Sequence, residues 1–556
     1  MHSVSADPKE STRHLFSTLS PLPTPSPSVR IRDLCSIFFQ TSDTVIQLNF
    51  TSLILAQALT TMSTTATLSA AELQRIRAQF PALVFADTPN TGMSGYVFAE
   101  NAGGSQVLST VAESITSYLL RTNVQMGAYP LAVSAERNVS LGTCAAAVLL
   151  GAESPDDVMI GQSATALVAS IALMIENQGR WGEGDEVVIS DADHETNRGA
   201  WTRLAKRLGM QLKNWPVETT SQNNAFAATL NPDALKDIVT PRTKLVAFTA
   251  CSNLLGAFTD IPKAVEIVRS IAPDALIVVD CVAFAPHRRV QPRVWGVDIA
   301  FFSLYKTYGA HVGAMYIDPR VKTQLKRLNH FFLQPSPGEG EGIKGMYPFQ
   351  TSSVQYELNH SIAAVADYLV SLGRGKVGEK GEEVDWNGLF ERASALPYVA
   401  QTKGSDGAAS SGRVKMTRAQ AEEVLDRAFA KIADHESKLS SLFIQALLKH
   451  ASKGVRIVGV ESSSSSERAP TVAFVAIDPS TGKQRVGTSK AIHTALVEGG
   501  KMGAQQGHMY AHRLVESLGL DLKDGVVRVS WVHYNTEEEV ERVVGWLDGV
   551  LEHVLG

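Results

Sequence analysis

An acid and a lysine each follow an apolar run that is rich in β-branched residues. Asp280 closes the run ALIVVD, and Lys306 stands 26 residues later, after VDIAFFSLY. Such residues meet when neighbouring buried strands end at one edge of a sheet. A lysine amine forms a Schiff base with pyridoxal phosphate, and a carboxylate keeps the pyridine nitrogen protonated, so that the ring withdraws electrons. We therefore predict that Lys306 carries this cofactor; the alternative is a surface lysine and an ordinary strand-end aspartate.

Three further polar residues follow or precede apolar runs in ways that suit a phosphorylated aromatic cofactor. Ser163, in GQSAT, stands before the helical run Ala166–Ile175, where free N–H groups bind phosphate; a plain N-cap is the alternative. His194 follows EVVIS and can stack on an aromatic ring or shuttle protons, or be structural. Asn253 follows LVAFTACS and can bind a phenolate oxygen, or serve as a turn residue.

Two more candidates concern phosphate and substrate. Ser303 stands three residues before the lysine and can reach the phosphate. Arg528 lies in VVRVSWVHYNT, among residues typical of a buried strand, where an arginine needs an acidic partner. A substrate carboxylate would bind it with two hydrogen bonds, and a protein acid is the alternative.

The elements that would position these residues alternate between strand and helix patterns. Five apolar runs lack the period-2 alternation of half-exposed strands, and helical segments such as Ile261–Ile271 lie between them. The runs are Glu186–Ser190, Lys244–Thr249, Ala275–Asp280, Asp298–Ser303 and Gly313–Ile317. This order predicts an α/β fold with a mostly parallel sheet covered by helices.

The 556 residues are enough for two to four domains. Residues 1–66 are Pro- and Ser-rich and predict a disordered extension, or a start assigned too early with Met62 as the initiator. Regular patterning begins at a capping box of Ser69 and Glu72. We predict a large cofactor-binding domain at 67–335 and a smaller α+β domain at 336–556. The latter contains a polar, Gly-rich, disordered insertion at about 373–412.

Composition excludes several classes of protein. The net charge of −5 gives no sign of nucleic-acid binding, and no window is apolar enough to span a membrane. The four cysteines are scattered, so we predict neither a metal site nor disulfides, but a reducing compartment such as the cytoplasm. Mitochondrial targeting by the N-terminal extension is the alternative, although Asp7 and Glu10 oppose it.

Eight motifs occur together in one order along residues 70–556, apart from the insertion. They are ENAGGSQ (100–106), GQSAT (161–165), DHETNRGAW (193–201), CSNLLG (251–256), VVDCVAFAPH (278–287), SLYKTYGAHVG (303–313), GHMYAHRL (507–514) and VRVSWVHYNTEEEV (527–540). In these the chain resembles class V aminotransferase-like enzymes of the cysteine desulfurase-like branch. The resemblance implies pyridoxal phosphate fold type I, with a seven-stranded-type sheet in the large domain and a smaller C-terminal domain.

The resemblance also implies a role for each matching position. Lys306 matches the Schiff-base lysine, Asp280 the partner of the pyridine nitrogen, and His194 the histidine stacked on the ring. The positions implied for other contacts are Asn253 for the ring oxygen, Ser163, Ala164 and Ser303 for the phosphate, and Arg528, Asn101 and His508 for the substrate. Family members are usually homodimers, in which Ser353 would serve the partner subunit's phosphate site.

Three positions depart from the family pattern. No cysteine lies beyond Cys281, so a nucleophilic cysteine that takes sulfur as a persulfide is not expected. Ala283 stands where relatives often have Gln or His, which removes one hydrogen bond to the cofactor. Tyr305 replaces the histidine that precedes the lysine in many desulfurases, which puts that proton relay in doubt.

We therefore expect an enzyme that acts on an α-amino acid through an external aldimine. Its expected reaction is that of a C–S lyase or an aminotransferase-class transferase without a persulfide cysteine. The APHR and VRVSWVHYNT segments resemble biosynthetic relatives, which makes decarboxylative carbon–carbon bond formation an alternative. A catalytically inactive scaffold is a second alternative, opposed by the joint retention of Lys306, Asp280, His194 and Arg528.

Overall fold

The computed structural model describes residues 67–333, 345–390, 412–499 and 502–556. The predicted extension at 1–66, including Met62, lies outside these residues. The N-cap of the first described helix, α2 (Ala70–Arg77), is Ser69. Its side chain accepts from the Glu72 N–H, and the Glu72 carboxylate accepts from the Ser69 N–H. The predicted capping box is therefore confirmed. Helix α3 (Pro81–Asp87) follows.

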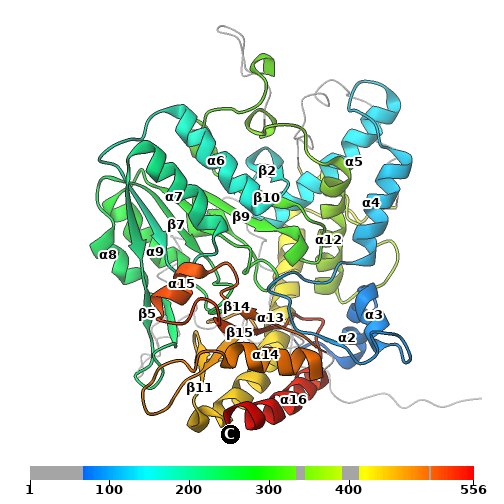
Figure 1. The fold of residues 1–556 in the computed structure, drawn as a ribbon. Helices are drawn as coiled ribbons and strands as arrows, with labels where there is room; N and C mark the ends of the chain where they lie inside the picture. Colours follow the sequence, from blue (N-terminus) through cyan, green and yellow to red (C-terminus); the bar gives the residue numbers. More distant parts are fainter. Residues whose placement is uncertain (1–66, 334–344, 391–411, 500–501) are drawn as a thin grey trace, which may run out of the picture. The chain divides into compact units, whose positions relative to one another are not determined.

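A seven-stranded sheet forms the centre of the fold (Figure 1). Its strands, in spatial order, are β2 (Val158–Gly161), β10 (Gly313–Ile317), β9 (Ile299–Ser303), β8 (Leu276–Asp280), β7 (Thr243–Thr249), β3 (Glu186–Ser190) and β4 (Gln211–Trp215). The five strands from β9 to β4 run parallel, whereas β10 is antiparallel to both neighbours. The nine residues 304–312 that join β9 to β10 are too few for a crossover helix. The predicted α/β fold with a mostly parallel sheet is confirmed.

Both faces of this sheet are buried, which explains why its strands lack alternation. Along β8, Ile277 and Val279 pack in one core, while Leu276 and Val278 pack in the core on the opposite face. One face is covered by α6 (Ala164–Gln178) and α7 (Thr196–Leu208), and the other by α5 (Pro130–Leu149) and α9 (Ile261–Ile271).

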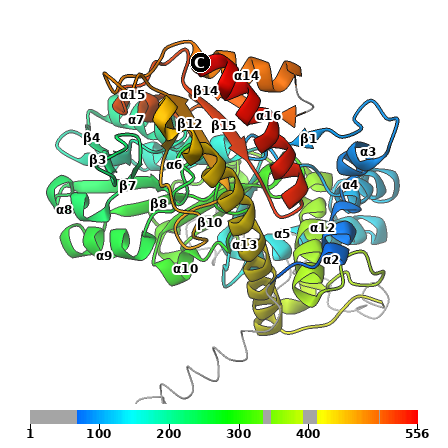
Figure 2. The same ribbon diagram turned by 90° about the horizontal axis from the view of Figure 1, so that it is seen from below.

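A second, antiparallel sheet carries the C-terminal part of the chain. Its strands are β11 (Val455–Val458), β12 (Thr471–Ala476), β15 (Val526–Ser530) and β14 (Gln505–Gly507), covered by α13 (Arg418–Lys449), α14 (Thr488–Gly499) and α16 (Glu537–Leu555). Figure 2 shows α13 as one long helix beside α12 and α16. Leu425 of α13 packs in the core of the large sheet and Phe443 in that of the second sheet, so α13 ties the two cores together.

The ends of the predicted insertion are ordered. Helix α12 (Tyr356–Arg374) packs on α4 (Ser109–Arg121) and α5 and ends at Gly375, whose φ of 72° is left-handed. Trp386 is fully buried and donates to Asp367 over 2.8 Å. Repeated glycines therefore mark tight turns at 375–390 where the sequence indicated disorder; residues 391–411 lie outside the described part. The described residues form one compact unit, and the division at 335/336 stays a prediction.

The segment after α3 joins the second sheet. β1 (Val97–Phe98) pairs in parallel with β13 (Met502–Gly503), and Glu100 forms an isolated parallel bridge with Ser530 of β15. The remaining elements are β5 (Val217–Thr219), β6 (Ala228–Leu230), α8 (Leu235–Ile238), α10 (Pro292–Trp295), α11 (Pro319–Lys322) and α15 (His512–Ser517). No helix among the described residues is long and apolar enough to cross a lipid bilayer.

Candidate active site

Asp280 and Lys306 lie together at the carboxyl edge of the large sheet. Asp280 is the last residue of β8, and Lys306 closes the single 3₁₀ turn Leu304–Lys306 that follows the neighbouring strand β9. Both side chains are buried, and both line an inner cavity of about 110 Å³. The proximity predicted from the two apolar runs is thus present in the fold.

Burial changes the protonation of both groups. The pKa of the Lys306 amine falls to about 8 because the amine is buried and the Arg528 charge is near, against the opposing attraction of Asp280. The pKa of Asp280 rises to about 6 because its carboxyl group is buried, although the Val282 N–H donates to Oδ1 over 2.8 Å. A part of the Lys306 population is therefore neutral near pH 7, as a nucleophilic amine requires.

The inner cavity also opens on the start of α6. Ser163 is the N-cap of this helix, its Oγ accepts from the Ala166 N–H over 3.1 Å, and Ala164 is the first helical residue. Gly313 lets the helix approach, because a Cβ there would lie 2.7 Å from the Ala164 nitrogen. Ser303, at the end of β9, completes this wall. A helix N-terminus beside hydroxyl groups is suited to a phosphate.

His194 and Asn253 stand between the inner cavity and a larger one. The Thr196 N–H donates to His194 Nδ1 over 3.0 Å, which places the ring proton on Nε2. Burial and the positive charges of Lys306 and Arg528 lower the pKa of His194 to about 4, so the ring is neutral at physiological pH. Asn253 donates through Nδ2 to the Met509 carbonyl over 2.9 Å, while its buried Oδ1 has no partner among the described residues.

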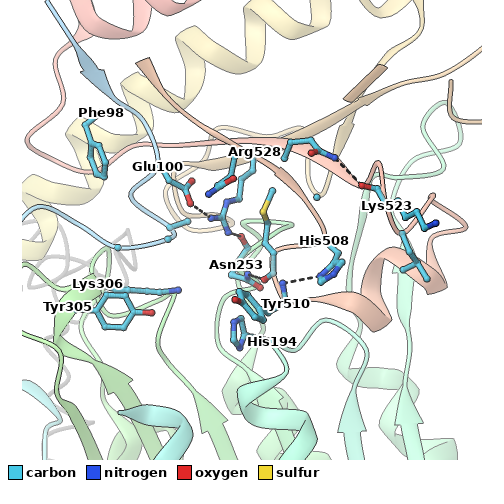
Figure 3. Close-up of a pocket in the computed structure, with 18 residues that line it drawn as sticks. Phe98, Glu100, His194, Asn253, Tyr305, Lys306, His508, Tyr510, Lys523 and Arg528 are labelled. Atoms are coloured by element: carbon cyan, nitrogen blue, oxygen red, sulfur yellow. Dashed lines mark hydrogen bonds and ion pairs between the residues drawn. The ribbon is translucent and has the colours of Figure 1, made fainter. Parts of the chain in front are cut away.

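The larger space, called here the outer pocket, has a volume of about 950 Å³ (Figure 3). Lys306, Asn253 and His194 line it from the side of the large sheet. The second sheet contributes Arg528, and the β1 segment contributes Glu100. The pocket is therefore built where the two sheets meet.

Arg528 of β15 is almost fully buried in this wall. Its Nη1 donates to the Asn253 carbonyl over 3.0 Å, and its Nη2 donates to Glu100 Oε1 over 2.8 Å. Of the two partners weighed from the sequence, a protein acid is the one present in the structure. The residues of both cavities fit pyridoxal phosphate, because they provide a buried amine, a buried carboxylate, hydroxyl groups beside a helix N-terminus, and an amide nitrogen with one hydrogen left to donate.

Comparison with known proteins agrees with this geometry. The family model for class-V aminotransferases matches residues 97–337. The aminotransferase-like protein FGM3 of Gibberella zeae is 32% identical over 489 residues, which cover 87% of this chain and 99% of that protein. The chain belongs to the class-V aminotransferase family.

Further relatives indicate the branch of this family to which the chain is similar. The cysteine desulfurase-like protein ustD of Aspergillus flavus is 26% identical over 484 residues, covering 86% of this chain and 91% of its own. A cysteine desulfurase structure from Thermococcus onnurineus NA1 has a TM-score of 0.63 at 17% identity, covering 86% and 98% of the two chains, and shows the same fold. This member of the class-V aminotransferase family is thus cysteine desulfurase-like, with pyridoxal phosphate fold type I and that cofactor.

Two predicted residues do not line either cavity. Asn101 is buried behind the pocket wall, where its Nδ2 donates to the Ser530 carbonyl over 2.8 Å and its Oδ1 accepts from the Tyr534 hydroxyl. Its neighbour Glu100 takes the place in the pocket. Ser353 is exposed and lines neither cavity of its own chain. His508 does line the outer pocket, and its contact with the substrate stays a prediction.

The loop that carries His508 has an unusual backbone that the sequence did not indicate. Met509 and Tyr510 have φ angles of 46° and 61°, in the left-handed region that side chains disfavour. Three contacts hold the turn: Asn253 binds the Met509 carbonyl, the Glu195 N–H donates to the Tyr510 carbonyl, and the Tyr510 N–H donates to His508 Nδ1. The turn places the Tyr510 ring 5.3 Å from that of His194.

The described cysteines have the properties of buried structural thiols rather than reactive ones. Cys144, Cys251 and Cys281 are buried, and burial raises the pKa of the first two thiols to about 12 and that of Cys281 well above its usual value. A thiol at such a pKa is protonated and unreactive at neutral pH.

Proposed function

We propose that the protein is a pyridoxal phosphate enzyme that acts on an α-amino acid, as a C–S lyase or an aminotransferase-class transferase without a persulfide-forming cysteine. One observation carries the proposal: the Lys306 amine and the Asp280 carboxyl group are buried at the same cavity, and that cavity adjoins a pocket containing Arg528. A buried amine with a lowered pKa beside a buried acid is typical of a catalytic site.

Each residue has a proposed part in holding the cofactor. Lys306 attaches to it, Asp280 pairs with its ring nitrogen, and His194 covers the ring. The residues for the phosphate are Ser163, Ala164 and Ser303 at the start of α6 and the end of β9. Asn253 keeps one amide hydrogen for the ring oxygen, since Met509 takes the other. When bound, the cofactor withdraws the negative charge that develops on the substrate carbon.

The remaining chemistry falls to side chains of the outer pocket. Arg528 binds the substrate α-carboxylate, which fixes the Cα atom near Lys306. With its pKa near 8, Lys306 Nζ can take a proton from that carbon and return it, because both protonation states are populated. The neutral His194 ring would exclude water from the wall of the pocket that it lines with Asn253.

The state of the cysteines supports a reaction that releases its sulfur product. The three described thiols are buried and protonated, so none is suited to receive sulfur from a substrate in the outer pocket. A C–S lyase of this kind would release sulfide to solvent rather than pass it to a protein thiol.

The size of the outer pocket favours a second candidate function. Its volume of about 950 Å³ includes the part that the cofactor would share beside Lys306, His194 and Asn253, and it lies at the upper end of the roughly 300–1,000 Å³ of ligand pockets. Carbon–carbon bond formation between an amino acid and a second substrate would use this space. Sulfide release from cysteine would support the first candidate, and carbon dioxide release from aspartate with an acceptor would support the second.

We further propose a homodimer in which Ser353 serves the partner's phosphate site. Apolar side chains stand exposed on and beside α4 and α5, among them Leu120, which is 80% exposed, and Tyr129, which is 50% exposed. Mixing Lys306→Ala with Ser353→Ala tests the idea, because a mixed dimer would regain one intact site. Activity that stays at the level of the separate variants would contradict the shared site.

The absorbance spectrum of the purified protein tests the central proposal. A cofactor band should be present, and it should shift with cysteine, aspartate or alanine. Lys306→Ala should remove the band of the lysine-bound cofactor, whereas Lys523→Ala, at the mouth of the same pocket, should keep it. Survival of an unchanged band in Lys306→Ala would refute the proposal.

A further inference from the structure

Glu100 is held beside Arg528 by the backbone of two distant segments. Residue 100 bridges to Ser530 of β15, the Ser530 N–H donates to the Ala99 carbonyl over 2.8 Å, and the Ala102 N–H donates to Ser530 Oγ over 2.8 Å. These bonds fix the backbone of Glu100, so its carboxylate lies next to the Arg528 guanidinium, as the dashed contact in Figure 3 shows.

The ion pair covers Arg528 but leaves one of its N–H groups without a hydrogen-bond partner among the described residues. The Arg528 side chain is 3% exposed and that of Glu100 is 17% exposed, so the acid forms the surface that a ligand meets. Only Nη2 and Oε1 are joined, over 2.8 Å. Arg528 Nε and Glu100 Oε2 are both buried and have no hydrogen-bond partner among the described residues. A guanidinium and a carboxylate usually form two parallel bonds, so this single-point pair is weaker than it could be.

Gly103 allows the acid to take this position. A Cβ on Gly103 would lie 2.2 Å from Glu100 Oε1, which is the oxygen that contacts Arg528. Any larger residue at 103 would push the carboxylate away from the guanidinium. The Gly103 N–H also donates to the Glu100 carbonyl over 3.1 Å, which closes the turn.

A substrate carboxylate cannot simply be added to this arrangement. Two carboxylates on one buried guanidinium would repel each other, and the guanidinium is covered by the first. The incoming carboxylate has to take the place of Glu100, and the displaced side chain then extends into the pocket that it already lines with Lys306.

We propose that Glu100 is a specificity-determining residue: its carboxylate occupies the substrate-carboxylate site on Arg528 in the empty pocket and is exchanged for the carboxylate of the substrate. The inference rests on the proposed function in one respect, the binding of the substrate carboxylate to Arg528. An amine without a carboxylate has nothing to exchange, so the ion pair stays closed and such ligands are selected against.

The test measures binding rather than turnover. Propionate has a carboxylate but no amine, so it cannot react with the cofactor, and calorimetry gives its Kd for the holoenzyme. Glu100→Gln keeps the shape of the side chain and removes the competing charge. We expect its Kd for propionate to be about tenfold lower than that of the wild type, the scale of one charge-assisted hydrogen bond.

Two further variants make the result specific. Gly103→Ala should also tighten propionate binding, because the new Cβ displaces the Glu100 carboxylate. Glu195→Gln removes an exposed acid whose backbone contacts the Tyr510 loop. Its Kd for propionate should stay within about twofold of the wild-type value, because solvent and salt screen the charge of an exposed side chain. An unchanged cofactor band shows that each variant is folded.

The outcomes separate this proposal from the proposed function. An equal or higher Kd in Glu100→Gln, with binding lost in Arg528→Gln, would overturn the exchange while leaving the carboxylate site in place. Propionate binding that survives in Arg528→Gln would overturn both. A tighter complex in Glu100→Gln and Gly103→Ala, but not in Glu195→Gln, would support the exchange.

Discussion

Replacing Lys306 by methionine should stabilise the cofactor-free protein at neutral pH. The folded state lowers the pKa of Lys306 from 10.5 to about 8, whereas the unfolded chain keeps the ordinary value. Each pH unit of difference corresponds to about 1.4 kcal/mol, so the protonated amine costs the folded state about 3 kcal/mol at pH 7. Methionine has a similar length and no charge, so the free energy of unfolding should rise by about that amount.

The gain should shrink as the pH rises, and the direction follows from the two pKa values. Well below pH 8 the amine is mostly protonated in both states, and nearly the whole cost is present. Between pH 8 and 10.5 the folded protein has lost the proton while the unfolded chain still binds it, so raising the pH stabilises the wild type. The advantage of Lys306→Met should therefore fall to about 1.4 kcal/mol at pH 9.5.

Urea unfolding followed by tryptophan fluorescence measures this difference after the cofactor is removed with hydroxylamine. Lys523→Met, an exposed lysine at the mouth of the pocket, is the matched control and should change stability by no more than about 0.5 kcal/mol. A loss of stability in Lys306→Met at pH 7, or a gain that does not fall by pH 9.5, would refute the conclusion that burial lowers the pKa of the Lys306 amine.

Three other substitutions have expected outcomes. Asp280→Asn should retain the cofactor band but lower kcat about 100-fold, the scale of a buried charge-assisted hydrogen bond, as steady-state kinetics would show. Tyr510→Phe should keep KM within about twofold because the ring still packs on His194, whereas Tyr510→Ala should raise KM several-fold. His194 has a pKa of about 4 in the folded state and 6.5 in the unfolded chain, so the wild type loses stability as the pH falls from 6.5 to 4. His194→Gln should reduce this loss by up to about 3 kcal/mol, as urea unfolding would show.

The large sheet could be predicted from the sequence because its strands are buried on both faces. Continuous apolar runs such as Glu186–Ser190 and Gly313–Ile317 match β3 and β10 residue for residue. Helix α9 matches its predicted bounds, with Pro262 in the first turn. Polar residues directly after such strands come together for a topological reason, so Asp280 and Lys306 could also be paired without a structure.

The polar wall of the outer pocket could not be predicted in the same way. Glu100 and Arg528 are 428 positions apart, and nothing in the local pattern of either indicates the other. The motif ENAGGSQ drew attention to Asn101, yet the parallel bridge to Ser530 turns Asn101 behind the wall and Glu100 into the pocket. Nor does GHMYAH indicate a left-handed turn, because Met509 and Tyr510 adopt it only through tertiary contacts.

The division of the site between two sheets makes its geometry depend on how they pack. Lys306 follows β9 and the N-terminus of α6 follows β2 of the large sheet, whereas Arg528 belongs to β15 of the second sheet. Asn253 joins them directly, since its carbonyl accepts from Arg528 and its amide donates to the Met509 carbonyl. Because Asn253, in the loop after β7, contacts both Arg528 and the loop that carries Tyr510, a shift of either would move the proposed substrate-carboxylate site relative to Lys306. We therefore expect Asn253 to position the substrate in addition to its proposed contact with the cofactor.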